Sequence, residues 1–306
     1  MREGVIKIPV GFFIFNRLDT TEKVFEEIRK YRPQKLYLIS DAARVDLEGE
    51  DRKVEEVRAY IENNIDWPCE VYKNYADSNM GCRRRMASGI TWLFEREEMA
   101  VILEDDCKPT QDFFLYMEEL LHKYKDDGRV AMISGCKTVR NYPMDNSYTF
   151  SRFPAIWGWG TWRRAWDYYD IDIRNWPILK RTNYFRQFYN FYGYLKVKHN
   201  FESVYAHKYD TWDYQWTYAM LINKGLNIVP NVNMIKNLGF GREDATHTKE
   251  KTKESFFCES MIFPLQHPND VEADEEYDKA YKNYNWGIRA IFSMLGRKIK
   301  KSLLKK

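Results

Sequence analysis

The sequence predicts an α/β fold with a mostly parallel central sheet flanked by helices. Two observations support this. Short apolar, β-rich runs alternate with helical patterns, as in Ile8–Phe15, the helix that starts at Asp19, and Lys35–Ile39. These strands also end in polar residues, and ligands bind at the carboxyl ends of strands in open α/β sheets. The 306 residues are enough for one large domain of this kind with an appendage.

The remaining elements follow from hydrophobic periodicity. Strands are expected at Ile8–Phe15, Lys35–Ile39, Cys69–Tyr72, Met99–Leu103, Val130–Ser134 and Leu226–Val229. Helices are expected from Asp19 to Pro33 and over Asp46–Asn63, Cys82–Arg96, Gln111–Tyr124, Asn183–Tyr205 and Trp216–Ile222. Between Tyr142 and Asp170 the sequence shows no regular period, so no element is predicted there.

Three acidic residues follow the buried strand Met99–Leu103 directly: Glu104, Asp105 and Asp106. Adjacent carboxylates at a buried strand end repel one another, so a cation is expected between them. Oxygen ligands suit Mn²⁺ or Mg²⁺, which commonly bridge to the phosphates of a substrate. The alternative is an acidic turn that caps the following helix, but a cap normally uses a single acid.

Three consecutive arginines, Arg83, Arg84 and Arg85, crowd the first turn of the helix predicted from Cys82. Positive charge there opposes the helix dipole, so at least one of them is expected to contact an anion such as a diphosphate. The alternative is that all three are solvated.

Tryptophans alternate with small residues at Trp157, Trp159 and Trp162. Glycine lets the backbone approach a ligand closely, and indole rings offer flat faces for a sugar. We therefore expect this segment to line the acceptor side of a cleft. The alternative is a buried aromatic core.

Composition excludes several classes of protein. The formal net charge of +3 argues against nucleic acid as a partner. The five cysteines show no metal-ligand spacing, which favours a reducing compartment. The N-terminus has no signal-peptide pattern and no apolar run is long enough to span a bilayer, so a cytoplasmic protein is expected.

The C-terminal segment changes in charge along its length. Residues 270–278 are strongly acidic, whereas the residues from Lys282 onward are basic without any acid. Apolar residues fall at helical spacing in this tail: Ile288, Ile291, Phe292, Leu295, Ile299 and Leu303. A basic amphipathic helix of this kind contacts an anionic surface such as the inner face of the plasma membrane. The alternative is a helix that packs on the body of the protein.

Taken together, these motifs resemble nucleotide-sugar glycosyltransferases of the GT-A fold. The likeness is to the animal N-acetylglucosaminyltransferases of N-glycan branching and to bacterial enzymes of surface-polysaccharide biosynthesis. It runs from Lys7 to Gly239 and is tightest at residues 101–106 followed by 112–114. The quoted motifs are Asn16-Arg17, Tyr31-Arg32-Pro33, Ser40-Asp41, Val101-Ile-Leu-Glu-Asp-Asp106 and Asp112-Phe-Phe114.

The resemblance implies a domain organisation. A glycosyltransferase domain would cover residues 1–268, with a donor half over 1–140 and an acceptor half over 141–268. Residues 269–306 would form an acidic linker and the amphipathic helix.

The resemblance also implies residue roles. Asp106 would ligate the metal directly, and Asp213 would be the catalytic base, although Tyr214 replaces the second acid of the family's Trp-Asp-Asp motif. His247 falls where many GT-A enzymes take a further metal ligand, but the animal enzymes lack it and a histidine in a loop is often simply exposed. The implied nucleotide and donor contacts are Asn16, Arg17, Asp41 (facing the uracil), Arg83, Arg85, Glu104 and Asp105.

These features predict metal-dependent transfer of a sugar from a UDP-sugar to a glycan or a lipid-linked saccharide. A base distinct from the metal acids implies a single displacement with inversion. One alternative, a sugar nucleotidyltransferase, needs a glycine-rich loop after the first strand, and Asn16–Asp19 contains no glycine. Two further alternatives are a glycoside hydrolase with two carboxylates and a non-catalytic module of the same fold that binds nucleotide-sugars.

Overall fold

The computed structural model describes residues 7–242 and 257–287. Strands of the main sheet are β1 (Val10–Ile14), β2 (Lys35–Ser40), β3 (Glu70–Tyr75), β4 (Met99–Glu104), β6 (Val130–Ser134), β7 (Tyr148–Ser151), β8 (Trp159–Trp162) and β9 (Leu226–Pro230). A small second sheet consists of β5 (Cys107–Pro109) and β10 (Ile235–Asn237). The helices are α1 (Leu18–Tyr31), α2 (Glu50–Asn64), α3 (Gly81–Phe94), α4 (Gln111–Lys123), α5 (Arg163–Trp166), α6 (Trp176–Arg181), the 3₁₀ helix η1 (Tyr184–Gln187), α7 (Phe191–Tyr205), α8 (Asp213–Ile222) and α9 (Glu275–Trp286).

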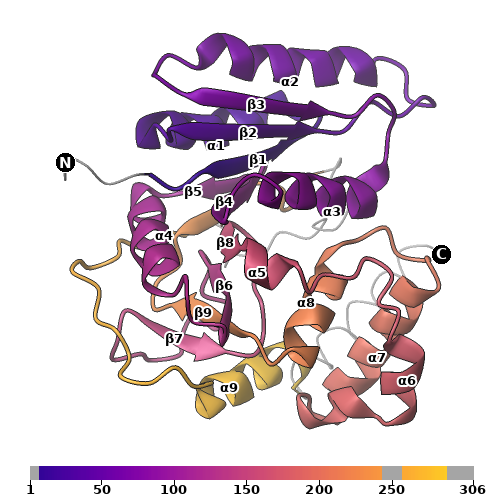
Figure 1. Ribbon diagram of the computed structural model, residues 1–306, viewed down its shortest axis with the longest axis vertical. Coiled ribbons are helices and arrows are strands. Elements are labelled where there is room, and N and C mark those ends of the chain that lie inside the picture. Colours follow the sequence, from indigo (N-terminus) through magenta and orange to yellow (C-terminus); the bar gives the residue numbers. More distant parts are fainter. Residues whose placement is uncertain (1–6, 243–256, 288–306) are drawn as a thin grey trace, which may run out of the picture.

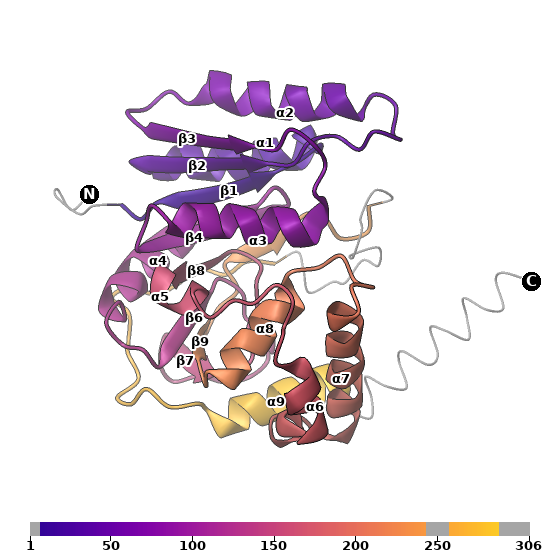
Figure 2. The same ribbon diagram turned by 45° about the vertical axis from the view of Figure 1, so that its right-hand side comes forward.

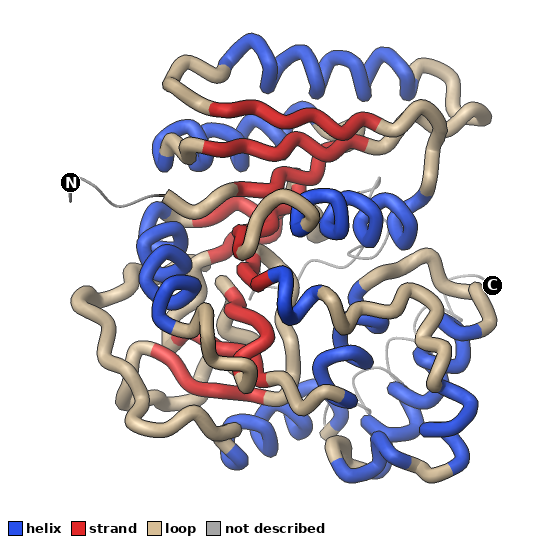
Figure 3. Tube along the Cα trace, in the orientation of Figure 1, coloured by secondary structure: helices blue, strands red, loops and turns tan. Residues whose placement is uncertain are grey.

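The main sheet has the strand order β3-β2-β1-β4-β8-β6-β9-β7 (Figure 1, Figure 3). Strands β7 and β8 run opposite to the other strands of this sheet. The predicted α/β fold with a mostly parallel, Rossmann-like central sheet flanked by helices is confirmed. Strand order reverses between β1 and β4, so their carboxyl ends form the switch point at which such sheets bind ligands.

Alternation along the central strands divides the core between the two faces of the sheet. In β4, Val101 and Leu103 pack on one face, whereas Ala100 and Ile102 pack on the other. Helices α1, α2 and α4 cover the first face. Helices α3, α5 and α8 cover the second (Figure 2). Both faces are therefore buried, which explains the near-continuous apolar sequence of these strands.

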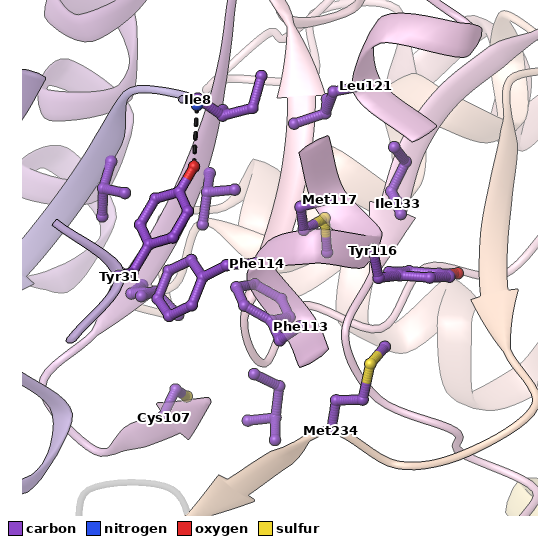
Figure 4. Close-up of a cluster of buried hydrophobic side chains, with 14 of the residues drawn as sticks. Ile8, Tyr31, Cys107, Phe113, Phe114, Tyr116, Met117, Leu121, Ile133 and Met234 are labelled. Atoms are coloured by element: carbon purple, nitrogen blue, oxygen red, sulfur yellow. Dashed lines mark hydrogen bonds between the residues drawn. The ribbon is translucent and has the colours of Figure 1, made fainter. Parts of the chain in front are cut away.

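The first face is packed with aromatic and aliphatic side chains (Figure 4). Tyr31 at the end of α1 stacks on Phe114 of α4, with ring centroids 4.1 Å apart and an interplanar angle of 5°. Its hydroxyl accepts a 2.9 Å hydrogen bond from the Ile8 amide and donates to Glu118. This stack joins α1 to α4. Helix α1 also contacts β5, the strand that directly follows the acidic motif in the sequence.

Several elements differ from the sequence prediction. Strands β7 and β8 lie within the segment for which no element was predicted. The helix predicted over Asn183–Tyr205 is interrupted between η1 and α7, because Asn190 is extended (ψ 172°) and caps α7 by accepting a hydrogen bond from the Gly193 amide. Helix α9 begins inside the acidic segment expected to be a linker, because Asp274 caps it by accepting from the Tyr277 amide.

Within the described part of the chain, no helix has the length and apolarity needed to cross a membrane. The apolar positions of the predicted C-terminal amphipathic helix, from Ile288 to Leu303, lie outside the described residues.

Candidate functional site

The candidate site lies at the carboxyl ends of β1 and β4. The two strands are parallel neighbours, with Phe13 paired to Glu104. Just beyond them, the Phe15 amide donates a 3.2 Å hydrogen bond to Asp105 Oδ2. The strand ends thus bring Asn16 and Arg17 beside Glu104, Asp105 and Asp106.

Burial and neighbouring negative charge raise the pKa of Glu104 and of Asp105. Desolvation, followed by the charges of Asp106 and Asp105, raises the pKa of Glu104 well above its ordinary value. Desolvation and the charge of Asp106 raise the pKa of Asp105 to about 7. Arg17 opposes both shifts. The fold therefore concentrates negative charge at this strand end, and a bound cation would relieve the repulsion.

Asp106 is held by side chains and backbone from distant segments. Arg17 Nη1 lies 3.4 Å from Asp106 Oδ2, and the Leu238 amide donates a 2.7 Å bond to the Asp106 carbonyl. A Cβ on Gly239 would lie only 2.3 Å from Asp106 Oδ2. The approach of the chain after β10 to this carboxylate therefore depends on glycine.

The donor set at the acidic motif consists of carboxylate oxygens, which suits Mn²⁺ or Mg²⁺. Across residues 7–242 and 257–287, no three His, Cys, Asp or Glu side chains are gathered in an arrangement that could hold a metal. His247, the predicted additional ligand, lies outside those ranges. The residues present thus fit a metal bound by one or two carboxylates and completed by substrate oxygens and water.

Asn16 contacts the start of α2. The side-chain amide of Asn16 donates a 2.7 Å hydrogen bond to Glu50 Oε1. The guanidinium and the backbone amide of Arg44 also donate hydrogen bonds to the Glu50 carboxylate. The hydrogen bond from Arg44 is the largest cause that lowers the pKa of Glu50. Arg44 also lies over the Phe15 ring, 5.7 Å from its centroid. This network fixes the loop after β1 against α2.

Asp41 joins the end of β2 to the start of α3. Its carboxylate accepts from the amides of Ala42 at 2.9 Å, Met80 at 2.9 Å and Gly81 at 3.0 Å. The side chain of Asn79 donates to it as well, at 3.3 Å. The carboxylate thus has several protein donors, and its contact with a base stays a prediction.

Arg58 was not singled out from the sequence. Its guanidinium donates to Ser40 Oγ at 2.9 Å and to the Asp41 carbonyl at 2.8 Å, and lies over the Tyr75 ring. Desolvation lowers the pKa of Arg58. It places a half-buried cation at the ends of β2 and β3, and nothing in the periodic sequence of α2 distinguishes it from a surface arginine.

Arg83 and Arg85 have protein partners in the structure. Arg83 pairs with Asp172 at 2.8 Å, donates to the Ile171 carbonyl and contacts His207 Nδ1. Arg85 donates to the side chain and the carbonyl of Asn74. Protein groups therefore occupy only part of each guanidinium, since the Nε atoms of both arginines are buried without a hydrogen-bond partner in the described part of the chain. Their contacts with a donor substrate stay predictions.

Asp213 begins α8 on the same side of the molecule as the acidic motif. Its Oδ1 accepts from the Tyr214 amide at 2.9 Å and from Thr211 Oγ1. The charge of Asp213 contributes to raising the pKa values of both Glu104 and Cys82. Within the described ranges, Asp213 Oδ2 has no protein hydrogen-bond donor. One carboxylate oxygen of this residue is therefore available to a substrate.

Asp210 positions the segment that leads to Asp213. Its carboxylate accepts from the amides of Cys82 at 3.0 Å and Arg83 at 2.8 Å, at the N-terminus of α3. Cys82 lies among the acids of both halves: Glu104, Asp210, Asp213 and Asp41 all raise its pKa, after desolvation. The acids of the first half and of α8 thus surround one position at the start of α3.

Two of the predicted acceptor-side tryptophans belong to the core instead. Trp159 and Trp162 lie in β8 with exposed fractions of 1% and 2%. Trp159 stacks on Trp212 at 5.5 Å, and Trp162 Nε1 donates to the Leu121 carbonyl at 3.0 Å. The prediction that these two side chains line a cleft is wrong, because β8 is paired on both sides within the main sheet. Trp157 is half-buried and contacts Phe240 edge to face.

Comparisons with known proteins give only distant likenesses. No family model matches the chain, and no curated protein matches it. Among solved structures, the fold is similar to a mannosyltransferase from Pyrobaculum calidifontis in complex with GDP-Man and Mn²⁺, with a TM-score of 0.36, 13% identity and coverage of 57% of this chain and 46% of that chain.

Two nucleotidyltransferases are similar at the same level. One is 4-diphosphocytidyl-2C-methyl-D-erythritol synthase from Anaerococcus prevotii, with a TM-score of 0.32, 7% identity and coverage of 52% of this chain and 71% of that one. The other is a UDP-glucose pyrophosphorylase complexed with UDP-glucose, with a TM-score of 0.27, 10% identity and coverage of 47% and 62%. The chain spans about half the length of the mannosyltransferase, and these scores assign no family.

Proposed function

We propose that this protein is a metal-dependent, inverting glycosyltransferase that moves a sugar from a UDP-sugar to a glycan or a lipid-linked saccharide. The observation that supports it best is the grouping of two kinds of acid at one end of the sheet. Glu104, Asp105 and Asp106 come from β4, and Asp213 comes from α8, close enough to raise the pKa of Glu104. A transferase needs both a site for the diphosphate and a separate base.

The donor would bind across the ends of β1 and β4. Asp106, with Glu104 and Asp105 beside it, would hold Mn²⁺ or Mg²⁺. When bound, such an ion neutralises charge on a leaving diphosphate. Arg17, which lies 3.4 Å from Asp106 in the structure, would contact the phosphates as a second positive charge. The predicted nucleotide and donor contacts of Asn16, Asp41, Arg83 and Arg85 belong to this same half.

The acceptor would be activated by Asp213. Its Oδ1 is fixed by Thr211 and by the Tyr214 amide, so the direction of Oδ2 is set before a substrate binds. The N-terminus of α8 stabilises negative charge on this side chain. Oδ2 would accept the proton of the attacking hydroxyl on the face of the sugar opposite the diphosphate, which gives inversion at the anomeric carbon.

A nucleotide-sugar screen tests this function. The full chain is melted with each nucleotide-sugar in the presence and absence of Mn²⁺, and donors that raise Tm only with the metal are then incubated with saccharide acceptors. We expect a UDP-sugar to stabilise the protein and to be consumed with release of UDP. Release of pyrophosphate from a nucleoside triphosphate and a sugar phosphate would indicate a nucleotidyltransferase, and saccharide cleavage without nucleotide binding would indicate a hydrolase.

The variant Asp213→Asn separates binding from chemistry. Asparagine keeps the acceptor that Thr211 and Tyr214 use but cannot take a proton, so transfer should fall by at least about a hundredfold. The UDP-dependent rise in Tm should persist. Wild-type activity in this variant would exclude Asp213 as the base. Metal-dependent binding without any turnover by the wild-type chain would instead favour a non-catalytic module.

A further inference from the structure

The helices α6, η1 and α7 form a small unit at the edge of the molecule, away from β1–β3 (Figure 1, Figure 2). It has a core of its own, in which Trp176, Phe185 and Phe201 pack with Tyr218 and Leu221 of α8. The unit packs on α8 and α9. One side of it is therefore fixed to the body of the protein.

The other side exposes large apolar side chains. Phe191, Tyr192 and Leu195 of α7 are 65%, 51% and 49% exposed. Their spacing places them on one helix face, while Gly193 lies against Trp286 of α9 on the side that packs inward. Ile178 of α6 is exposed as well. An exposed apolar group of this kind on a helix generally marks an interaction site.

This unit carries an excess of positive charge, with Glu202 of α7 as the one acid of its three helices. Residues 176–201 contain five Lys or Arg and no Asp or Glu: Lys180, Arg181, Arg186, Lys196 and Lys198. Lys180 is paired with Glu202, and Lys198 lies over the Tyr194 ring. Arg181, Arg186 and Lys196 are exposed and have no carboxylate partner among residues 7–242 and 257–287. Lys196 follows Tyr192 by four residues and so shares the exposed face of α7, and Arg181 and Arg186 are exposed in the neighbouring α6 and η1.

The last described helix, α9, packs on the inward side of α7. Trp286, the last residue of α9, packs on Tyr189, and its carbonyl accepts a 3.3 Å bond from Asn190, the cap of α7. The following residues 288–306 contain seven Lys or Arg and no acid. The sequence that follows α9 is therefore basic as well.

We propose that the exposed face of α6 and α7 docks onto an anionic membrane. Phe191, Tyr192 and Leu195 enter the interfacial region of the bilayer, where aromatic and aliphatic side chains of amphipathic helices reside. Arg181, Arg186 and Lys196 lie among the headgroups. A second copy of the chain fits less well, because a symmetric contact would bring these unneutralised cations together. The proposal does not depend on the transferase activity.

Vesicle sedimentation with the full chain tests this docking. The vesicles contain phosphatidylcholine alone or phosphatidylcholine with phosphatidylglycerol. We expect binding only to the anionic vesicles. The triple variant Phe191→Ser, Tyr192→Ser, Leu195→Ser should weaken it at least about tenfold. The control variant Val45→Ser, Leu115→Ser, which alters exposed apolar residues elsewhere, should bind as the wild type does.

A second variant tests the charges independently. Arg181→Gln, Arg186→Gln, Lys196→Gln should lower the affinity for anionic vesicles severalfold, and added salt should reduce the difference. Equal binding to both kinds of vesicle, or unchanged binding by both triple variants, would overturn the proposal. So would a wild-type dimer in size-exclusion chromatography that the serine variant dissociates while neither protein binds vesicles. Loss of binding on removal of residues 288–306 alone, with no effect of the α6 and α7 variants, would assign docking to the tail and overturn it for this face.

Discussion

The carboxylate of Asp210 accepts a 2.8 Å hydrogen bond from the backbone amide of Arg83, from which it is separated by 127 residues. The same carboxylate accepts from the Cys82 amide, so it caps the N-terminus of α3 in place of a local side chain. Since Asp213 follows three residues later, this contact connects the proposed base to the half of the chain that carries the acidic motif. Asp210 is in this sense a positioning residue.

Replacing Asp210 tests this positioning. Asp210→Ala removes the two hydrogen bonds that cap the N-terminus of α3 and should lower the free energy of unfolding by about 1–2 kcal/mol. It should also lower kcat more than it raises the KM for the donor, because the base loses its fixed direction. Asp210→Asn, which keeps one acceptor, should be intermediate in both. Asp172→Ala removes only the exposed ion-pair partner of Arg83 and should leave kcat unchanged. Equal kcat in wild type and Asp210→Ala would contradict the role.

The first half of the fold could be predicted because its strands are buried on both faces and its helices have one apolar face. Strand β4 shows this best, because its apolar run predicts the strand and the acids that follow predict where the strand ends. β8 could not be predicted in this way. Gly160 lies in its centre, and a Cβ at this residue would come within 3.1 Å of side chains of α4. Packing therefore requires a small residue at a position where a typical strand sequence has a large one.

The site was only partly predictable for a related reason. Acidic residues that follow a strand are visible in the sequence, but their partners come from elsewhere in the chain. Arg58 reaches the ends of β2 and β3 from the middle of α2, and Gly239 reaches Asp106 from the loop after β10. Neither has a local pattern that distinguishes it. The three-residue strands β5 and β10 are likewise too short to show a period.

Gly239→Ala should disturb the acidic motif without removing any acid. The added methyl would lie 2.3 Å from Asp106 Oδ2, so the carboxylate must move or the loop must shift, at a cost of about 1–3 kcal/mol. We expect the Mn²⁺-dependent rise in Tm to be lost or strongly reduced. Gly128→Ala is the matched control, because a Cβ at that residue meets no atom within 4 Å. Its stability should change by less than about 0.5 kcal/mol. Normal Mn²⁺ dependence in Gly239→Ala would argue against Asp106 as a metal ligand.

Asp278 anchors α9 to β7 and should be one of the most sensitive surface-helix positions. Asp278 is 1% exposed. Its carboxylate accepts a 2.6 Å hydrogen bond from Ser151 Oγ and forms an ion pair with Arg152 at 2.8 Å. Asp278→Ala leaves these groups without their acceptor and should cost about 2–3 kcal/mol in urea unfolding. Glu275→Ala removes the 68% exposed partner of the same arginine and should cost less than about 1 kcal/mol. Similar losses of unfolding free energy in both variants would show that the burial of Asp278 contributes nothing to the stability of the fold.

His267 should make the fold less stable in mild acid. Desolvation, followed by the charge of Lys123, lowers the pKa of His267 from its ordinary 6.5, although Glu119 at 3.3 Å opposes this shift. The ring also contacts the Tyr148 hydroxyl through Nδ1 at 2.9 Å. Because the folded pKa is depressed, the unfolded chain takes up the proton first. The contribution of the neutral ring is therefore present above pH 6.5 and lost as pH falls from 6.5 through the folded pKa. His267→Gln, which cannot titrate, should lose less Tm than the wild type between about pH 8 and about pH 5. A wild-type Tm that falls no more steeply than that of the variant over this range would show that His267 does not govern the acid response.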